Sequence, residues 1–544
     1  MATSDPPKSQ AGCRAAPSAP AASSTGGGRI ARNVVANWVW YLLVLISGFV
    51  LPRLLDRHQG QELLGIWDLG WSLVFHISLL ALGIASAVQR YVARLRTVQD
   101  WAALNNVAST CLALLSAGAV LGLAASAVLA ACIQVFLPNT DPALYGTARW
   151  VVFLLCASAA VQMPASVFNA VITGYERYDV LNLLRGVRDL VVLVVMGALL
   201  IMGQSLVALA WVTLLGEIVL WVANWVAARR LCRPLRLSVS SCHWSTAREV
   251  IGFGFRAVLQ TVARTGLYQV NSLFVAFFLG PAVLAVYARQ RALVMHLWRF
   301  VKQYAQVFIP ASSALDARAD TAALQRLLTQ SSKYGLYVTL PATVLLLVMG
   351  GPLLNVWMGP SYEAPLVLGV LAVAHLLAVP QLGAFSILLG MGRHGWPAVF
   401  ELVAAGIGIA AGLIVLGPLQ GGTVGAAATL ALPIAVNGGI VLPAYACRVL
   451  QLSWQDYLRA VVPGPVLAGL PFTCCLVLAR LGFPDTPPVA LMAGAGAGGV
   501  VTVAVYWRWV VPGAWKARAL SRLRGRRCRV PILNRAAVAS SEGT

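Results

Sequence analysis

The sequence predicts an all-α polytopic membrane protein of about 14 transmembrane helices, built as two six-helix lobes followed by two C-terminal helices. Of its 544 residues, 59% are hydrophobic and only 11% are charged, with a mean hydropathy of +0.78. Average soluble domains carry about 25% charged residues. Apolar runs of roughly 20 residues follow one another, and basic residues gather in the short gaps between them, as in membrane proteins.

Fourteen apolar segments are long enough to be candidate membrane spans. They cover residues 34–52, 66–88, 107–136, 149–173, 189–203, 206–228, 250–279, 281–310, 335–357, 365–390, 396–417, 421–446, 459–480 and 487–508. The fifth segment is short, and a start nearer Leu181 would lengthen it. The seventh and eighth segments are the most polar of the set.

Lys and Arg predict the orientation. With the N-terminus placed in the cytoplasm, the cytoplasmic segments carry 30 of the 40 basic residues and the outside loops carry 4. Because cytoplasmic loops are enriched in Lys and Arg, we expect both termini to be cytoplasmic. With spans of roughly 20 residues placed as above, no outside loop is longer than about 15 residues. We therefore expect no folded domain outside the membrane.

The two tails and the cysteines indicate no soluble function. Residues 1–30 are rich in Ala, Ser, Pro and Gly and are expected to be a disordered cytoplasmic tail, whereas residues 512–544 form a basic tail suited to anionic lipid. The net charge of +22 is spread between apolar runs, which argues against nucleic acid as a partner. The ten cysteines lack C-x-x-C spacing and are interpreted as apolar fillers, and we expect no metal and no cofactor.

A weak internal repeat predicts two lobes. "LLGIWDLGWSLV" (63–74) and "VLAVYARQRALV" (283–294) open the second and eighth spans in the same phase. Between the two tails we therefore predict four parts. They are an N-lobe (31–230), an inter-lobe loop (231–249), a C-lobe (250–447) and a final pair of spans (448–511). Repeated lobes are typical of transporters that work by alternating access.

The eighth span carries an unusual amount of positive charge. Arg289, Arg291, His296, Arg299 and Lys302 lie within it. A basic residue at the bilayer centre costs about 2.5–3.5 kcal/mol on insertion scales, so several of them facing lipid would be untenable. At 100° per residue they fall within an arc of about 160°, which predicts a cationic face that needs water, a counter-charge or an anionic ligand.

The seventh span repeats this pattern. Arg256, Gln260 and Arg264 recur every four residues, and Asn271 extends the same stripe. The seventh and eighth spans together hold six Lys or Arg and no Asp or Glu. This surplus indicates an anionic cargo, and arginine forks suit phosphate oxygens, so a phosphate or diphosphate is the natural candidate. Snorkelling to the cytoplasmic surface remains an alternative for Arg256 and Lys302.

Few acidic or titratable groups lie in the other spans. Asp68, His76, Glu217 and Glu401 are the candidates for coupling to protons or ions. Structural pairing of the carboxylates with arginines, and simple packing of His76, are the alternatives. A phosphate-binding G-x-x-x-x-G-K-[ST] loop is not present, so ATP is not expected to drive transport.

Four stretches share patterns of Gly, Pro and aromatic residues with a known family. They are "LPRLLDRHQGQELLGIWDLGWSLVFHISLLALGIASAVQRYVARL" (51–95), "PASVFNAVITGYERYDVLNLLR" (164–185), "LYQVNSLFVAFFLGPAVLAVYARQRAL" (267–293) and "FIPASSAL" (308–315). They resemble bacterial polysaccharide flippases of the multidrug/oligosaccharidyl-lipid/polysaccharide exporter superfamily, and the resemblance covers roughly residues 30–510.

This resemblance implies a pseudo-symmetric, V-shaped bundle in the bacterial cytoplasmic (inner) membrane. Such a protein would translocate a polyprenyl-diphosphate-linked oligosaccharide, in contact with membrane lipids and with polysaccharide polymerase or export machinery as further partners. The cationic cavity would be lined by the basic and polar residues of the seventh and eighth spans. A peptidoglycan-precursor flippase and a drug exporter remain alternatives, although the first span lacks the carboxylate of the drug exporters. A membrane glycosyltransferase or polymerase is a further alternative that the short outside loops disfavour.

Overall fold

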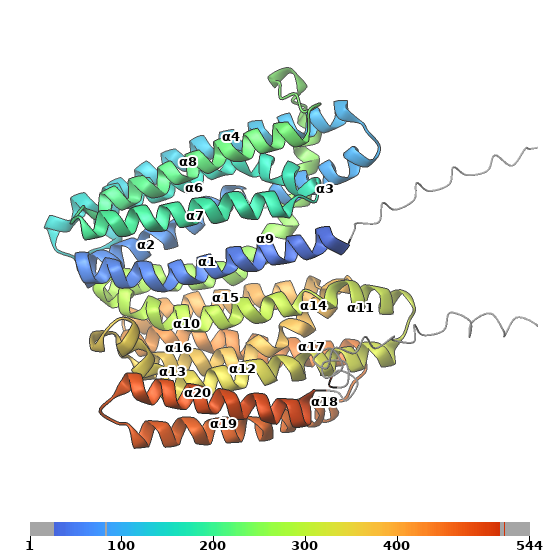
Figure 1. The fold of residues 1–544 in the computed structure, drawn as a ribbon. Helices are drawn as coiled ribbons and strands as arrows, with labels where there is room; N and C mark the ends of the chain where they lie inside the picture. The colour runs from blue at the N-terminus through green and yellow to red at the C-terminus, as the bar shows by residue number, and fades with distance from the viewer. Residues whose placement is uncertain (1–26, 82–83, 512–515, 517–544) are drawn as a thin grey trace, which may run out of the picture.

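The computed structural model describes residues 27–81, 84–511 and 516, without the side chains of 27–36, 85–86 and 253–264. Its described residues form helices and no strands (Figure 1). The first group of helices is α1 Gly27–Gln59, α2 Gln61–Ser78, η1 Leu79–Ala81, α3 Ile84–Thr97, α4 Trp101–Ala131, α5 Ile133–Phe136, η2 Pro142–Leu144, α6 Tyr145–Gly174, α7 Tyr178–Ile201 and α8 Leu206–Leu231. After the short helix η3 Val239–Ser241, α9 Trp244–Leu279 leads into the second group.

The second group follows the same up-and-down course. It contains α10 Pro281–Ala305, α11 Phe308–Ala317, α12 Thr321–Trp357, η4 Pro360–Tyr362, α13 Pro365–Ala378, η5 Val379–Gln381, α14 Leu382–Gly390, α15 Gly395–Leu416, α16 Gly422–Val436, η6 Asn437–Val441, α17 Leu442–Val449, α18 Trp454–Val461, α19 Pro463–Gly482, α20 Pro487–Val505 and η7 Tyr506–Val510. The η6 and η7 segments are π-helical turns.

The predicted fold class is confirmed. Eleven helices among the described residues are long and apolar enough to cross a membrane. Three further long helices, α7, α9 and α10, run alongside them (Figure 1) and bring the number to fourteen. These three contain the charged residues of the fifth, seventh and eighth predicted spans. Span five is longer than its apolar core suggested, because α7 begins at Tyr178.

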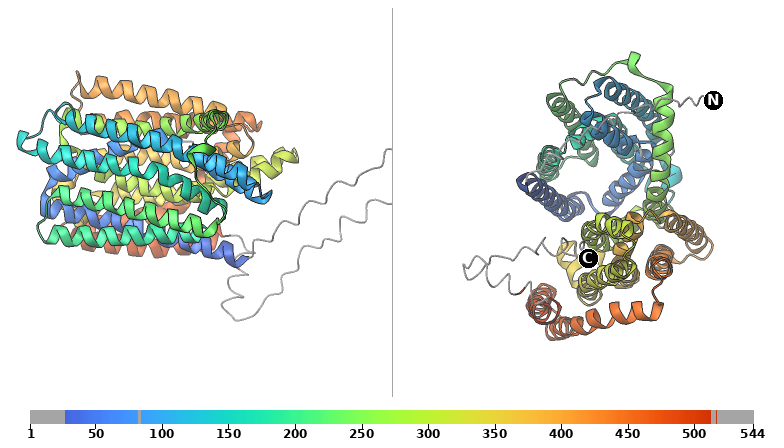
Figure 2. Two further views of the ribbon diagram at one scale, coloured as in Figure 1. Left: turned by 90° about the horizontal axis from the view of Figure 1, so that it is seen from above. Right: turned by 90° about the vertical axis from the view of Figure 1, so that its right-hand side faces the viewer.

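The helices run roughly parallel, so the bundle has two ends (Figures 1 and 2). We call the end where α1 begins and η7 finishes the terminal end. The opposite end, which holds the turns at Gly60 and Gly280 and the short helix η4, is the distal end. Fourteen crossings return the chain to the end at which it started, as the even number of predicted spans required.

Two groups of helices form the two lobes. The end-on view in Figure 2 separates α1–α8 from α10–α20. Helix α9 begins against α3 and α4 of the first group and finishes against α15 and α16 of the second. The pair α19–α20 packs on α12 at the edge of the C-lobe. The residue boundaries predicted for the two lobes stay predictions.

The internal repeat has a conformational counterpart at the distal end. Gly60, which precedes α2, has φ 89° and ψ 168°, and Gly280, which precedes α10, has φ 91° and ψ 166°. Residues with side chains rarely adopt a positive φ, so glycine permits the same sharp turn in both lobes. The turn folds α2 back on α1 and α10 back on α9.

A second pair of matching features lies at the terminal end. Asp100 caps α4 by accepting a hydrogen bond from the Ala103 amide, and Asp320 caps α12 through the Ala323 amide, each at 2.9 Å. The residue before each aspartate has a positive φ, 55° in the first lobe and 52° in the second. Both pairs of features, the distal glycines and these aspartates, are separated by 220 positions, so the two lobes share one local design.

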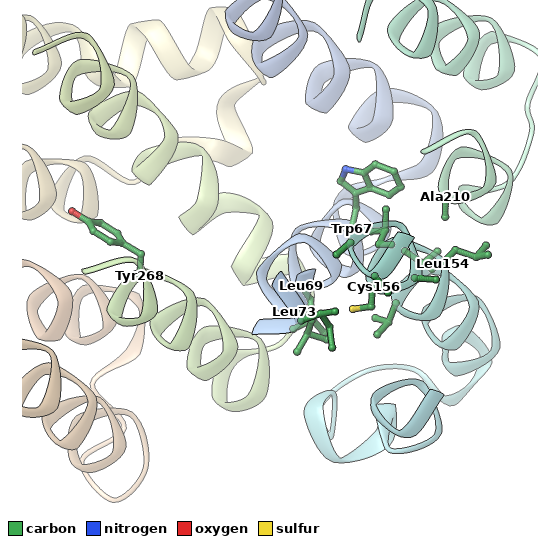
Figure 3. Close-up of a cluster of buried hydrophobic side chains, with 14 of the residues drawn as sticks. Trp67, Leu69, Leu73, Leu154, Cys156, Ala210 and Tyr268 are labelled. Carbon is green, nitrogen blue, oxygen red and sulfur yellow. The ribbon is translucent and has the colours of Figure 1, made fainter. Parts of the chain in front are cut away.

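Apolar side chains fill the N-lobe where α2, α6 and α8 meet. Figure 3 shows Trp67, Leu154 and Ala210 from these three helices in one cluster, and each is at most 5% exposed. Cys156 lies in the same cluster, fully buried, as expected of an apolar filler. Tight packing of this kind holds the N-lobe as a rigid unit.

A close approach between the lobes involves a glycine of α2. A Cβ atom on Gly65 would lie 1.8 Å from the carbonyl oxygen of Pro281 at the start of α10. No side chain fits there, so the backbones of α2 and α10 touch at this point. The contact joins the two lobes near the distal end.

We expect Gly65→Ala to destabilise this contact by about 1–3 kcal/mol, the usual effect of overpacking. The apparent midpoint of thermal unfolding of the purified protein in detergent should fall. Gly406→Ala is the matched control, because a Cβ at that helical position meets no atom within 4 Å. Equal midpoints for the two variants would contradict the close approach.

Candidate functional site: the interface between the lobes

An ion pair links the two lobes through α2 and α10. Nη2 of Arg289 lies 2.6 Å from Oδ1 and 2.7 Å from Oδ2 of Asp68. The two side chains are 6% and 15% exposed. Charge-assisted hydrogen bonds of this length are strong, and a buried charge without its partner is costly. Asp68, predicted as a coupling group, is thus the counter-charge of a predicted substrate-binding residue.

The guanidinium of Arg289 is only partly satisfied. Its Nε and Nη1 atoms are buried and have no hydrogen-bond partner among the described residues. Buried donors of this kind usually have a partner, and leaving one unpaired costs about 1–3 kcal/mol. Arg289 therefore keeps the capacity to bind a second acceptor while it holds Asp68.

Arg291 faces a different neighbour. Its Nη1 donates to the carbonyl oxygen of Tyr268 at 2.8 Å and contacts the hydroxyl of Ser272, both on α9. The two arginines lie at opposite edges of the predicted 160° arc, so one points to α2 and the other to α9. In the distal half of α10, the predicted cationic face therefore contacts two helices, α2 and α9.

Polar contacts close the distal end around this ion pair. The indole nitrogen of Trp357 donates to the carbonyl oxygen of Phe49 at 2.7 Å. Gln290 donates to the carbonyl oxygen of Tyr362 at 2.6 Å, and the Tyr362 hydroxyl donates to Asp56. Burial raises the pKa of Tyr362, and the bond to the Asp56 carboxylate raises the pKa further, so the hydroxyl keeps its proton and stays a donor. Two of these contacts, those to Phe49 and Asp56, join α1 of the N-lobe to the C-lobe.

The remaining cationic groups of α10 lie toward the terminal end. His296 stacks on Phe49 of α1 with ring centroids 5.3 Å apart. Arg299 and Lys302 are exposed, and the Lys302 ammonium lies 4.9 Å from the centre of the Trp298 ring. In this half of α10 the predicted cationic stripe is accessible.

Asn271 lies among helices of the C-lobe, and its predicted binding role stays a prediction. We expected its amide to continue the cationic stripe, but Nδ2 donates to the Ala426 carbonyl at 2.9 Å and Oδ1 accepts from Tyr287 at 2.6 Å. Asn271 is 4% exposed and joins α9, α10 and α16 inside the C-lobe. A helical wheel gives the direction of a side chain but not the helix that covers it. The side chains of Arg256, Gln260 and Arg264 lie outside the described residues.

The other candidate coupling groups lie apart from the ion pair. His76 Nδ1 is 2.9 Å from the carbonyl oxygen of Ser72, one turn back on α2. Glu217 is paired with Arg188 inside the N-lobe at 2.7 Å. Glu401 lines a cavity of about 70 Å³ in the C-lobe, together with His375, which is within 3.0 Å of the Tyr268 hydroxyl. The three residues therefore do not form one relay with Asp68.

A charged cluster on α7 was not predicted from the sequence. Arg188 and Asp189 follow Arg185 by three and four residues, one turn along this helix, whereas both arginines precede the predicted fifth span at 189–203. The i, i+3, i+4 spacing was a signal that they share one helical face. Because α7 begins at Tyr178, these side chains are carried into the N-lobe.

Comparison with known proteins agrees with this architecture. A family model described as "Polysaccharide biosynthesis protein" matches residues 79–366, more than half of the chain. The uncharacterized membrane protein EpsK of Bacillus subtilis (strain 168) is 21% identical over 472 residues, which is 85% of this chain and 92% of EpsK.

Two solved structures share the fold. One is the inward-facing conformation of a multidrug resistance MATE family transporter of the MOP superfamily, with 15% identity and a TM-score of 0.66 over 78% of this chain and 98% of the transporter. The other is the lipid II flippase MurJ in an inward closed conformation, with 12% identity and a TM-score of 0.64 over 91% of this chain and 99% of MurJ. At these identities the likeness concerns the fold alone.

The link between Asp68 and Arg289 predicts energetic coupling. Asp68→Asn and Arg289→Gln should each lower stability, because each leaves a buried group without its charged partner. The double variant should lose less than the sum of the two, with a coupling free energy of about 0.5–3 kcal/mol from a double-mutant cycle on thermal unfolding.

The pair formed by Arg177 and Asp179 serves as the control for this cycle. It lies two residues apart at the start of α7, and its side chains are 34% and 13% exposed. Its arginine is a third exposed and it joins no two lobes, so we expect the weaker coupling of pairs near the surface, about 0–1 kcal/mol. Additive effects at Asp68 and Arg289 would show that the inter-lobe pair contributes nothing to stability.

Proposed function

This chain belongs to the polysaccharide biosynthesis protein family, and from that premise we propose that it is a flippase for a polyprenyl-diphosphate-linked oligosaccharide. The cargo would be a repeat unit of a surface polysaccharide or O-antigen. It would cross the cytoplasmic membrane by alternating access between the two lobes. The chain itself is a multi-pass membrane protein of the MATE/MurJ type of fold.

The observation that carries this proposal is the state of Arg289. Its guanidinium bridges the lobes through one nitrogen and has two buried nitrogens without a hydrogen-bond partner in the part of the chain that the structure describes. If the distal end opens, Asp68 on α2 moves away from α10, and the guanidinium needs another anion. The diphosphate of the cargo is such an anion, with oxygens that match the guanidinium fork.

Anion exchange gives the lobe movement a physical cause. A ligand shifts a conformational equilibrium only by as much as its affinity differs between the two states. Diphosphate bound to Arg289 would replace the carboxylate that holds the distal end closed, so it would favour the open state. Release of the cargo would let Asp68 return.

The exposed basic groups give this exchange a direction. Arg299 and Lys302 lie nearer the terminal end, which we propose to be cytoplasmic from the excess of basic residues there. In the conformation described here the distal end is closed, so the cargo would approach from the cytoplasm. It would meet Arg299 and Lys302 first, and then Arg289, while Arg264 and Arg291 on either side of the α9–α10 turn would complete the cationic lining.

Two features bear on rival functions. The cationic face of α10 is unsuited to cationic drugs, and MurJ-like folds leave a peptidoglycan-precursor flippase as the main alternative cargo class. The coupling roles of Asp68, His76, Glu217 and Glu401 remain part of the proposal. The glycan chemistry of the cargo is the direct test.

Deletion of the gene should cause the lipid-linked oligosaccharide to accumulate in the cytoplasmic membrane. Mass spectrometry of the lipid extract would identify the glycan and distinguish a polysaccharide repeat unit from a peptidoglycan precursor. An unchanged lipid profile, with normal surface glycan, would contradict the proposed function. Elongation of glycan by the purified chain would instead indicate a glycosyltransferase.

Arg264→Ala, Arg289→Ala and Arg291→Ala should each abolish surface glycan while the amount of protein in the membrane stays unchanged. Each variant removes a positive charge that we assign to diphosphate binding. Arg393→Ala, at an exposed position after α14, is the control and should export normally. The double variant with Asp68→Asn and Arg289→Gln separates folding from function, since it removes both charges together and should still fail to export. Normal export by all these variants would end the cationic-site assignment.

A further inference from the structure

A second polar cavity lies among helices of the N-lobe. Its volume is about 210 Å³, and α1, α6, α7 and α8 supply its walls. A cavity needs only about 10–15 Å³ on this measure to hold one water. The space is therefore large enough for a small molecule, in a part of the lobe that the proposed transport cycle does not yet use.

The charges around this cavity are balanced among themselves. Arg188 lies between two carboxylates, 3.3 Å from Asp189 and 2.7 Å from Glu217. The Trp40 indole donates to Asp189 at 2.9 Å, and Gln162 reaches Glu217 at 3.4 Å. Arg185 also lines the cavity, so two arginines balance the two carboxylates and no excess negative charge is left for a cation to neutralise.

Several buried polar atoms of the lining remain unpaired. Asn224 is 1% exposed, and neither its amide nitrogen nor its amide oxygen has a partner among the described residues. The side-chain oxygen of Asn169 and Nε of Arg188 are also buried and unpaired. Because native proteins satisfy most of their buried polar atoms, a group of four such atoms on one cavity indicates a ligand.

The unpaired atoms define the chemistry of that ligand. Two are donors, the Asn224 nitrogen and Arg188 Nε, and two are acceptors, the oxygens of Asn224 and Asn169. An anion would satisfy only the donors, and a metal cation would satisfy only the acceptors. A hydroxyl group both donates and accepts, so a ligand bearing several hydroxyls satisfies all four atoms.

The size and the aromatic walls point to a sugar. Trp40 and Trp221 line the cavity, and indole rings offer apolar faces to the C–H face of a sugar ring. The volume of about 210 Å³ lies below the roughly 300 Å³ at which pockets for drug-sized ligands begin. One sugar residue fits this space better than a whole repeat unit.

We propose that this N-lobe pocket binds a single sugar residue of the glycan cargo through its hydroxyl groups. The inference rests on the proposed function, because a glycan cargo is what would bring a sugar to the pocket. Asn224 and Asn169 would contact the hydroxyls, while Arg188, held by Glu217 and Asp189, would position its Nε toward them. The pocket would thus select the sugar, and the cationic residues of α10 would hold the diphosphate.

Saturation-transfer difference NMR on the full-length protein in nanodiscs tests this pocket directly. The probes are methyl glycosides of common neutral hexoses, deoxyhexoses and N-acetylhexosamines, each offered alone at millimolar concentration. We expect signal transfer to the ring protons of at least one glycoside. Asn224→Leu should weaken that binding at least about tenfold, since a sugar hydroxyl would then be buried without a partner.

Two further variants make the result decisive. Asn437→Leu is the matched control, because its amide oxygen is likewise buried and unpaired but belongs to the C-lobe, and it should bind as the unmutated protein does. Asn169→Leu provides a second test if Asn224→Leu fails to fold. Absence of signal for every glycoside, or binding unchanged in both pocket variants, would overturn the proposal and leave a cavity filled by water.

The outcome is independent of the lipid analysis of the deletion strain. If lipid-linked oligosaccharide accumulates but no glycoside binds, the chain is a flippase without this sugar pocket. If glycosides bind but the lipid profile is unchanged, the pocket exists and the proposed cargo is wrong. The two proposals therefore fail separately.

Discussion

The ion pair between Asp68 and Arg289 is the interaction on which the closed distal end depends. It is the point where two apolar lobes share a buried charge, and both residues come from helices that would otherwise contact through apolar side chains and a glycine. Separating the two charges in a dry interface is costly, whereas exchanging one anion for another costs far less. Because the Asp68 carboxylate holds the distal end closed and another anion would replace it, binding of an anionic cargo would shift the lobes toward the open state.

The polar side chains of α10 lie in three environments: against α2, against α9 and on an accessible face. Arg289 is directed to α2 and Arg291 to α9, and Arg299 farther along the helix is exposed. Its charges therefore combine structural roles with the proposed binding role. The N-lobe cluster around Arg188 follows the same principle, since internal pairs fix the walls while unpaired amides face the cavity.

The apolar pattern was sufficient for the helices and for their number, because a bilayer demands long hydrophobic segments. The apolar pattern did not predict which polar side chains contact one another. Asp68 lies 221 residues before Arg289, and nothing local in either segment specifies the pairing. The contact of Asn271 with α16 could not be predicted for the same reason. Arg185 and Arg188 fell before the predicted fifth span because Arg185, Arg188 and Asp189, three charges within five residues, interrupt the apolar window that marks a span.

The 220-residue repeat has a consequence for how a passenger sits in the protein. The position that corresponds to Arg289 in the first lobe is Leu69, and the position that corresponds to Asp68 in the second lobe is Ala288. The twofold relation of the backbone is thus broken by the side chains, and the first lobe has no guanidinium at the position that corresponds to Arg289. A symmetric binding site would accept its cargo in two equivalent poses. The ion pair at the lobe interface is asymmetric, so the head group would be oriented in the same way in every cycle.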